Sequence, residues 1–242
     1  MKQKYIDALG RGDGEMLHKV VDEWSYVLLR YQEFMELFGK DAKRVALLNA
    51  LSPAFTHDLQ VQLSNALILG LCRLTDKDPR SVSVCHLPRF IRDNTDLRAE
   101  VDCHVARAQT YAEAGRVRRN KWIAHRDKVR TDITVLYKDI KAGLDAVHAA
   151  LNAVAMDYWE HFIPNKVTSL QMPSARFVAS LESLVEGVMY IESRIDPTGE
   201  SGPFDDEVSK AFLRRIGGDP SADLVKLRRL RAAVKTIKEG LD

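Results

Sequence analysis

The stretch of sequence that decides the fold spans residues 131–162 and reads TDITVLYKDIKAGLDAVHAALNAVAMDYWEHF. Its large apolar residues recur at intervals of three and four, which places them on one face of an α-helix. Thr131 and Asp132 come just before this periodic run and are suitable N-capping residues. The pattern therefore predicts a long amphipathic helix whose inward face consists of Ile133, Leu136, Tyr137, Ile140, Leu144, Val147, Leu151, Val154, Tyr158 and Phe162.

Two more helices with buried faces are expected before it. Residues 13–38 carry an apolar stripe at three- and four-residue spacing, and Gly39 is a plausible stop. Residues 53–74 follow a Ser52–Pro53 start signal and are apolar on two sides, which is typical of the most buried helix of a bundle. Gly70 inside this helix indicates either close backbone packing against a neighbour or a tolerated glycine.

The intervening segment predicts a third, more polar helix. Residues 96–114 have modest helical periodicity, and Gly115 is expected to break the helix. Before it, residues 80–94 are expected to be irregular, with one helical turn at 86–92. A short amphipathic segment, residues 116–130, then leads to the long helix.

The C-terminal third predicts further helices after a linker. Residues 163–173 contain two prolines and resemble a linker, residues 174–194 have a helical stripe that includes Phe177 and Leu181, and two short helices are expected at 205–216 and 222–239. No strand-like alternation occurs. We therefore expect an all-α protein: an antiparallel helical bundle over residues 13–163, followed by a helical C-terminal extension, residues 164–242, to which the sequence assigns no role.

Composition restricts the classes of function. The 242 residues carry a formal net charge of +2, so only local clustering of charge favours nucleic acid. No apolar run approaches the ~20 residues that span a bilayer, and no signal peptide is visible, so no membrane partner is expected. Cys72, Cys85 and Cys103 are an odd number without a CxxC pair, which favours a reducing cytoplasm over disulfides. The histidines lack zinc-site spacing, and we expect neither a metal nor another cofactor.

One segment differs from the rest of the chain in its charge. Residues 116–130, RVRRNKWIAHRDKVR, contain seven basic residues and one acidic residue. Arg119 and His125 within it are a sensible pair for handling phosphate, because a guanidinium can hold phosphate oxygens and an imidazole exchanges a proton near neutral pH. The plainer interpretation is a solvated basic face with a buried histidine after Trp122, Ile123 and Ala124. A second basic run, residues 226–238, is better explained as a solvated helix face than as an RNA contact.

The run Arg119-Asn120-Lys121-Trp122-Ile123-Ala124-His125-Arg126-Asp127 resembles the signature of the HEPN superfamily: an arginine, a polar residue, and a histidine after four to six intervening residues. The Ala-His-x-Asp ending, with a buried helix like residues 63–76 some fifty residues upstream, is similar to the abortive-infection, AbiU-type branch. The resemblance covers roughly residues 20–162. It implies a HEPN-like helical bundle that dimerises across the motif helices.

The resemblance also implies a function. Many HEPN members are metal-independent endoribonucleases of phage defence or toxin–antitoxin systems. Carried over, Arg119 would hold the scissile phosphate, His125 would transfer a proton during attack by the 2′-hydroxyl, and Asn120 would contact phosphate or orient a partner. We expect RNA and a second copy of the chain as partners, with an antitoxin or another regulatory protein as a further one. The candidate RNA-binding cations are Arg116, Arg118, Lys121 and Arg126.

Two alternatives stay open, and the chain departs from the family pattern at one position. Arg118 can replace Arg119 as the functional arginine. Some toxin members have a tyrosine two residues after the histidine as the target of a modifying antitoxin, and here that position is Asp127. The chain can also be a non-catalytic HEPN-fold protein, an RNA- or nucleotide-binding module or an interaction scaffold, in which Arg119 and His125 perform no chemistry.

Overall fold

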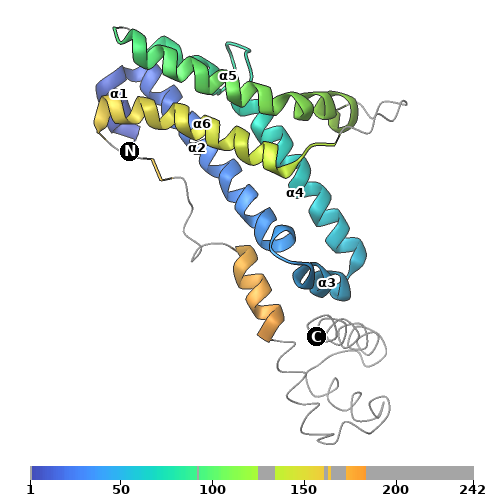
Figure 1. The fold of residues 1–242 in the computed structure, drawn as a ribbon. Coiled ribbons are helices and arrows are strands. Elements are labelled where there is room, and N and C mark those ends of the chain that lie inside the picture. Colours follow the sequence, from blue (N-terminus) through green and yellow to red (C-terminus); the bar gives the residue numbers. More distant parts are fainter. Residues whose placement is uncertain (1, 92, 125–133, 161–162, 165–172, 184–242) are drawn as a thin grey trace, which may run out of the picture. The chain divides into compact units, whose positions relative to one another are not determined.

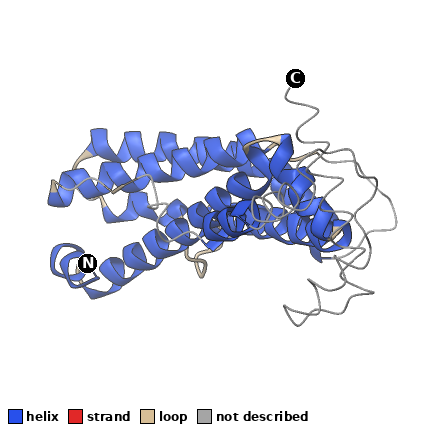
Figure 2. Ribbon diagram, turned by 90° about the horizontal axis from the view of Figure 1, so that it is seen from below, coloured by secondary structure: helices blue, strands red, loops and turns tan. Residues whose placement is uncertain are grey.

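The computed structural model describes residues 2–91, 93–124, 134–160, 163–164 and 173–183, and this part of the chain is helical with no strand (Figures 1 and 2). The all-α prediction is therefore confirmed. The helical elements, in chain order, are α1 (Lys2–Leu9), α2 (Arg11–Phe34), the π-helical turn η1 (Met35–Gly39), α3 (Ala42–Leu51), α4 (Pro53–Leu74), the 3₁₀ helix η2 (Val84–Phe90), α5 (Thr95–Arg118), the π-helical turn η3 (Arg119–Ala124), α6 (Tyr137–Trp159) and a helix over residues 173–183.

The chain divides into two compact units. The first comprises residues 1–32 and 62–171, and the second comprises residues 33–61 and 172–242. The second unit thus groups η1, α3 and the first part of α4 with the C-terminal segment. The expected division into a bundle over residues 13–163 and an extension over residues 164–242 stays a prediction. The segments expected to be helical at 205–216 and 222–239 lie outside the described residues, as does the basic run at 226–238.

The first unit is a bundle of α5, α6 and the adjoining parts of α2 and α4. Figures 1 and 2 show α5 and α6 side by side. They run antiparallel, because Asn94 at the start of α5 donates to Asp157 near the end of α6 over 3.2 Å. The bundle core consists of Val20, Trp24, Val27 and Leu28 of α2, Leu67, Leu71 and Leu74 of α4, Val101, Val105, Ala108 and Ala112 of α5, and Ile140, Leu144, Val147, Leu151 and Val154 of α6.

Trp24 connects α2 to α6 in this core. Its ring is 2% exposed, and its indole Nε1 donates a hydrogen bond of 3.2 Å to the Leu144 carbonyl. The same ring stacks on His148 with a centroid distance of 5.1 Å. His148 Nε2 lies 2.6 Å from the Ile163 carbonyl oxygen. A buried Trp N–H needs such a partner, so the acceptor on α6 fixes the position of this ring.

Close approach of α4 to its neighbours depends on two glycines. A Cβ atom built on Gly70 would lie 2.5 Å from Cγ2 of Val27, and one on Gly143 would lie 2.9 Å from Cδ2 of Leu71. Of the two interpretations of Gly70, close backbone packing is therefore the correct one. The prediction that α4 is the most buried helix holds from Leu63 onward, whereas Phe55 and Val61 in its first half are exposed.

Two local expectations were wrong, and two short helices were missed. Gly115 does not end the third helix, because α5 continues to Arg118 with Gly115 packed against α4. The long helix begins at Tyr137: Leu136 is its extended N-cap residue and is 42% exposed, and residues 131–133 lie outside the described part. Two short helices, α1 and α3, were not predicted. Each is too short for apolar periodicity, although Asp41 caps α3 by accepting from the Arg44 amide.

The second unit contains a small ion-pair cluster. Glu36 of η1 accepts from Lys40 and from the guanidinium of Arg44. Burial alone would raise the pKa of Glu36, but these hydrogen bonds and charges hold it below its usual value. Arg44 also pairs with Glu182 of the 173–183 helix at 4.0 Å. That helix buries Val178 and Leu181, whereas Phe177, predicted in its stripe, is 41% exposed.

Gly70→Ala is expected to lower the free energy of unfolding by about 1–3 kcal/mol, as overpacking of a core does. Valine is stiff at χ1, so Val27 cannot turn away from the added methyl group, and this cost exceeds the ~1 kcal/mol gained in helix propensity. Denaturant unfolding of the full chain measures the change.

Gly12→Ala is the matched control, because no atom lies within 4 Å of its added Cβ and the substitution should be neutral or stabilising. Adding Val27→Ala to Gly70→Ala should cost less than the two single changes together. Equal stability of Gly70→Ala and Gly12→Ala would contradict the packing explanation.

Candidate functional site

The basic motif lies where α5 changes its helical form. The α-helical part ends at Arg118, and η3 continues the chain as a π-helical turn from Arg119 to Ala124. The Arg119 N–H is directed at the carbonyls of Gly115 and Arg116 in the last α-helical turn. Single π-helical turns within helices occur frequently at functional sites. The described part of the motif, residues 116–124, therefore lies on a continuous helical segment.

Arg119 and Asn120 contact each other at the start of η3. The Arg119 Nε donates to the Asn120 side-chain oxygen over 3.0 Å. Arg119 is partly exposed and Asn120 is exposed, and the contact between them uses one of the three guanidinium nitrogens of Arg119. Arg118 and Lys121 are partly exposed on the same segment. His125 and Arg126 lie outside the described residues.

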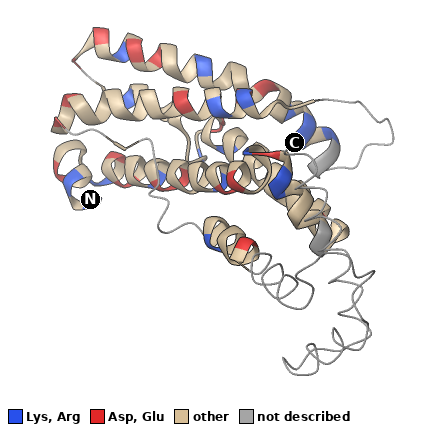
Figure 3. Cartoon of the chain, turned by 60° about the horizontal axis from the view of Figure 1, so that its bottom comes forward, with Lys and Arg blue, Asp and Glu red and all other residues tan. Residues whose placement is uncertain are grey.

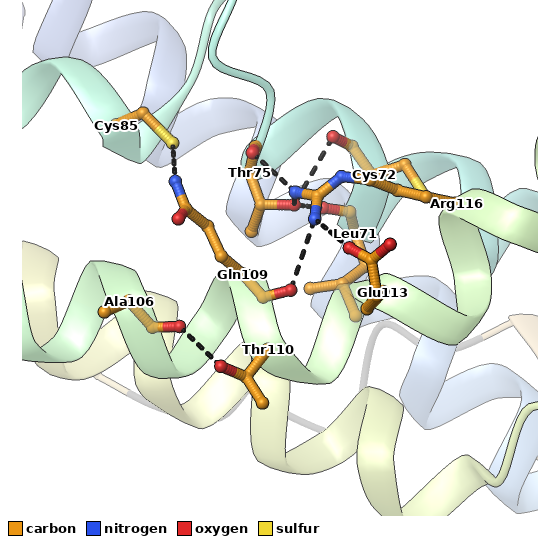
Figure 4. Close-up of polar contacts among 9 residues, drawn as sticks. All are labelled: Leu71, Cys72, Thr75, Cys85, Ala106, Gln109, Thr110, Glu113 and Arg116. Carbon is orange, nitrogen blue, oxygen red and sulfur yellow. Dashed lines mark hydrogen bonds and ion pairs between the residues drawn. The ribbon is translucent and has the colours of Figure 1, made fainter.

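Arg116, one turn earlier, uses its guanidinium within the fold (Figure 4). Nη2 donates to both the carbonyl and the hydroxyl of Thr75, at 2.7 and 2.8 Å. Nη1 donates to the Gln109 carbonyl at 3.2 Å and lies 3.3 Å from a Glu113 carboxylate oxygen. These contacts join the end of α5 to the end of α4.

The end of α4 receives caps from two other parts of the chain. Helix C-termini leave carbonyls without an intrahelical partner. Ser83 Oγ donates to the Leu74 carbonyl at 2.9 Å, while Arg116 supplies the donor for the Thr75 carbonyl. Thr75 is fully buried, and its hydroxyl also donates to the Leu71 carbonyl at 2.7 Å. The carbonyl groups at the C-terminus of α4 therefore have hydrogen-bond donors, and this helix end lies beside the motif.

The loop that follows α4 is held by its own side chains. Asp76 accepts from the Asp78 amide, and Asp78 accepts from the Arg80 amide and guanidinium. Ser81 donates to the Asp78 carbonyl at 2.7 Å, and His86 Nε2 lies 3.1 Å from the same oxygen. The hydrogen bonds from Arg80 hold the pKa of Asp78 below its usual value. The loop keeps a defined shape next to the end of α4.

Cys72 is a buried thiol beside the motif arginines. Burial raises the pKa of the Cys72 thiol, while the positive charges of Arg119 and Arg116 act in the opposite direction and favour the thiolate. The effect of burial is the larger one, because moving a thiolate out of water costs more free energy than its attraction to two partly exposed cations provides.

Charge elsewhere is mixed along the helices, as Figure 3 shows. In the described ranges, no group of three His, Cys, Asp or Glu residues is placed to hold a metal ion. In the same ranges, none of the helices has the length and hydropathy that crossing a membrane requires.

The sequence identified the segment but not the residues that support it. Thr75 and Gln109, which accept from Arg116, carried no motif signal, because their role depends on a contact between distant helices. The one available indication was a threonine directly after the apolar stripe of α4, where a helix terminus needs partners.

Comparison with protein families gives a match over most of the chain. The model of the family described as AbiU2, a HEPN family, matches residues 14–172, about two thirds of the chain. No curated protein matches, and no solved structure does. The matched range includes the bundle of the first unit and the whole basic motif.

Cys72 is expected to resist alkylation in the folded protein, because it is buried and its raised pKa leaves little thiolate near pH 8. Cys103 is exposed and serves as the internal control. Mass spectrometry after a short iodoacetamide treatment should find Cys103 modified and Cys72 unmodified, and denaturant should make Cys72 reactive. Equal rates in the folded chain would contradict this placement.

Proposed function

Because the chain belongs to the AbiU2 family of the HEPN superfamily, the abortive-infection branch, we propose that it is a metal-independent endoribonuclease acting in phage defence. The observation that carries the proposal is the placement of Arg119 and Asn120. They pair with each other on a helical turn through Nε of the guanidinium, and the Arg119 side chain is partly exposed. A plain solvated face would not require this arrangement.

The proposed chemistry is an internal transesterification. The 2′-hydroxyl oxygen bonds to the adjacent phosphorus while the bond from phosphorus to the 5′-oxygen breaks, which leaves a 2′,3′-cyclic phosphate and a 5′-hydroxyl. His125 takes the proton of the attacking hydroxyl, and the leaving 5′-oxygen takes a proton from water. Arg119 donates to the phosphate oxygens, where negative charge increases in the transition state.

Asn120 has a positioning role in this proposal. Its side-chain oxygen accepts from Arg119 Nε, so it orients the guanidinium and leaves the terminal nitrogens for bidentate contact with phosphate. Arg119 in preference to Arg118 is supported by this same contact. Arg118, Lys121 and Arg126 would then provide charge along the RNA backbone.

We further propose that the active form is a homodimer in which two Arg119/His125 pairs face one cleft. Isologous dimers are the commonest oligomers, and a two-fold axis beside η3 would bring the two basic motifs to one RNA strand. A monomeric mass by light scattering at high micromolar concentration, in a preparation that cleaves RNA, would overturn this arrangement.

His125→Ala is expected to reduce RNA cleavage by about 10²–10⁴-fold, because it removes the proton-transfer group. Arg119→Ala should reduce both the rate and RNA affinity. Arg119→Lys should recover only part of the activity, since an ammonium lacks the two-pronged fork of donors. Cleavage of mixed RNAs in EDTA with end-group analysis measures all three, and Arg107→Ala, an exposed arginine earlier on α5, is the control.

Two results would reject the nuclease. One is wild-type cleavage by His125→Ala, and the other is a requirement for a divalent ion. DNA should not be cleaved, because it has no 2′-hydroxyl. A wild-type protein that binds RNA without cleaving it would instead support the non-catalytic binding module. If His125→Ala fails to fold by circular dichroism, the buried-histidine interpretation is correct.

A further inference from the structure

We propose that Arg116 is a positioning residue that holds Arg119 in place through the end of α4, and that it is not a phosphate ligand. This inference rests on the proposed function for its substrate, but the contacts that carry it lie wholly within the described fold. It reassigns a cation that the charge pattern alone grouped with the RNA contacts.

The first step is that the donors of Arg116 are already used. Its two terminal nitrogens contact Thr75, Gln109 and Glu113, and only Nε lacks a place in this set. The side chain is 21% exposed. A phosphate would have to displace hydrogen bonds to a buried threonine, so its gain would be offset by the unpaired carbonyl left behind.

The second step is that the acceptor favours a cation. The Thr75 carbonyl is at the C-terminus of α4, where the helix dipole places partial negative charge. The Thr75 hydroxyl donates to Leu71, so its lone pairs point outward to receive the Arg116 hydrogen bond. Arg116 thus supplies a donor to the C-terminus of α4, and the hydrogen bonds that it makes there are charge-assisted (Figure 4).

The third step is that Arg116 is coupled to Arg119 through the backbone. The Arg119 N–H is directed at the carbonyls of Arg116 and Gly115. Gly115 lies against Ile68 and Cys72, so that the turn has α4 on one side. When Arg116 releases Thr75, the last turn of α5 keeps its packing against α4 but loses these hydrogen bonds, and Arg119 at the start of η3 is held less firmly.

The experiment compares variants that lose one or both hydrogen bonds from Arg116 to Thr75 with a variant that removes only a charge. Arg116→Ala removes the donor, and Thr75→Val removes the hydroxyl acceptor without changing charge. Thr75→Val keeps the backbone carbonyl and therefore loses only the hydrogen bond to the hydroxyl. Thr75→Ser restores the hydroxyl and is the conservative rescue. Arg107→Ala removes an exposed cation from the same helix and is the control. Arg119→Ala is the reference for removal of a phosphate ligand.

Three readouts on the full chain separate the roles. Hydrogen exchange by mass spectrometry follows the amides of residues 117–121 without RNA. Steady-state cleavage gives kcat and KM. The salt dependence of single-stranded RNA binding reports the number of phosphates that the protein neutralises, since the slope of log K against log salt falls by about 0.7 for each phosphate that is no longer bound.

For Arg116→Ala and Thr75→Val we expect faster exchange at residues 117–121, a kcat lower by about 10- to 100-fold, a KM within about twofold and an unchanged salt slope. Thr75→Ser and Arg107→Ala should behave as wild type. Arg119→Ala should lower the slope. Circular dichroism confirms that each variant is folded, and exchange elsewhere in α5 and α6 should not change.

Three outcomes overturn the inference: a salt slope for Arg116→Ala that falls as it does for Arg119→Ala, wild-type exchange at residues 117–121 in both Arg116→Ala and Thr75→Val, or failure of Thr75→Ser to rescue. If wild-type protein neither binds nor cleaves RNA, the proposed function fails. The exchange result then still decides whether Arg116 holds this turn.

Discussion

The hydrogen bonds from Arg116 to the C-terminus of α4 are the interaction on which the motif depends. α4 is the helix with two apolar sides, and it approaches α2 and α6 closely enough to need Gly70 and Gly143. Its position is therefore fixed by the core, and Arg116 extends that fixed position to the end of α5. The end of α5 is held against α4 because a single guanidinium supplies the donor for the carbonyl at the C-terminus of a buried helix.

Burial and charge are balanced around this junction. Cys72, Thr75 and Gly115 bring apolar and neutral groups against two arginines, and the raised pKa of Cys72 shows that burial prevails over the nearby cations. A low-dielectric neighbourhood strengthens the electrostatic contacts that an arginine makes on its exposed side. The same neighbourhood penalises any guanidinium without partners, which explains why Arg116 is so completely hydrogen-bonded.

The sequence predicted the long helices, whose apolar residues recur at regular intervals, and missed the features that depend on a single contact. Apolar residues in α2, α4 and α6 recur over several turns, so the pattern located these helices to within a few residues. Gly115 was expected to end the helix because glycine has a low helix propensity. In the structure the helix continues, and Gly115 packs against Ile68 and Cys72. The motif segment was recognisable by its charge. The different roles of Arg116 and Arg119, however, follow from the contact of Arg116 with Thr75, which lies forty-one residues before Arg116. No local sequence pattern contains that contact.

The π-helical turn at residues 119–124 has a consequence for how such a motif can vary. A wider turn accommodates one residue more than an α-helical turn without breaking the helix. Related chains can therefore gain or lose a residue between the arginine and the histidine by converting between the two kinds of turn, with the arginine still anchored to the preceding helix. A variable spacing between the arginine and the histidine of the signature would then result from a change between α-helical and π-helical turns, and not from a loosely specified site.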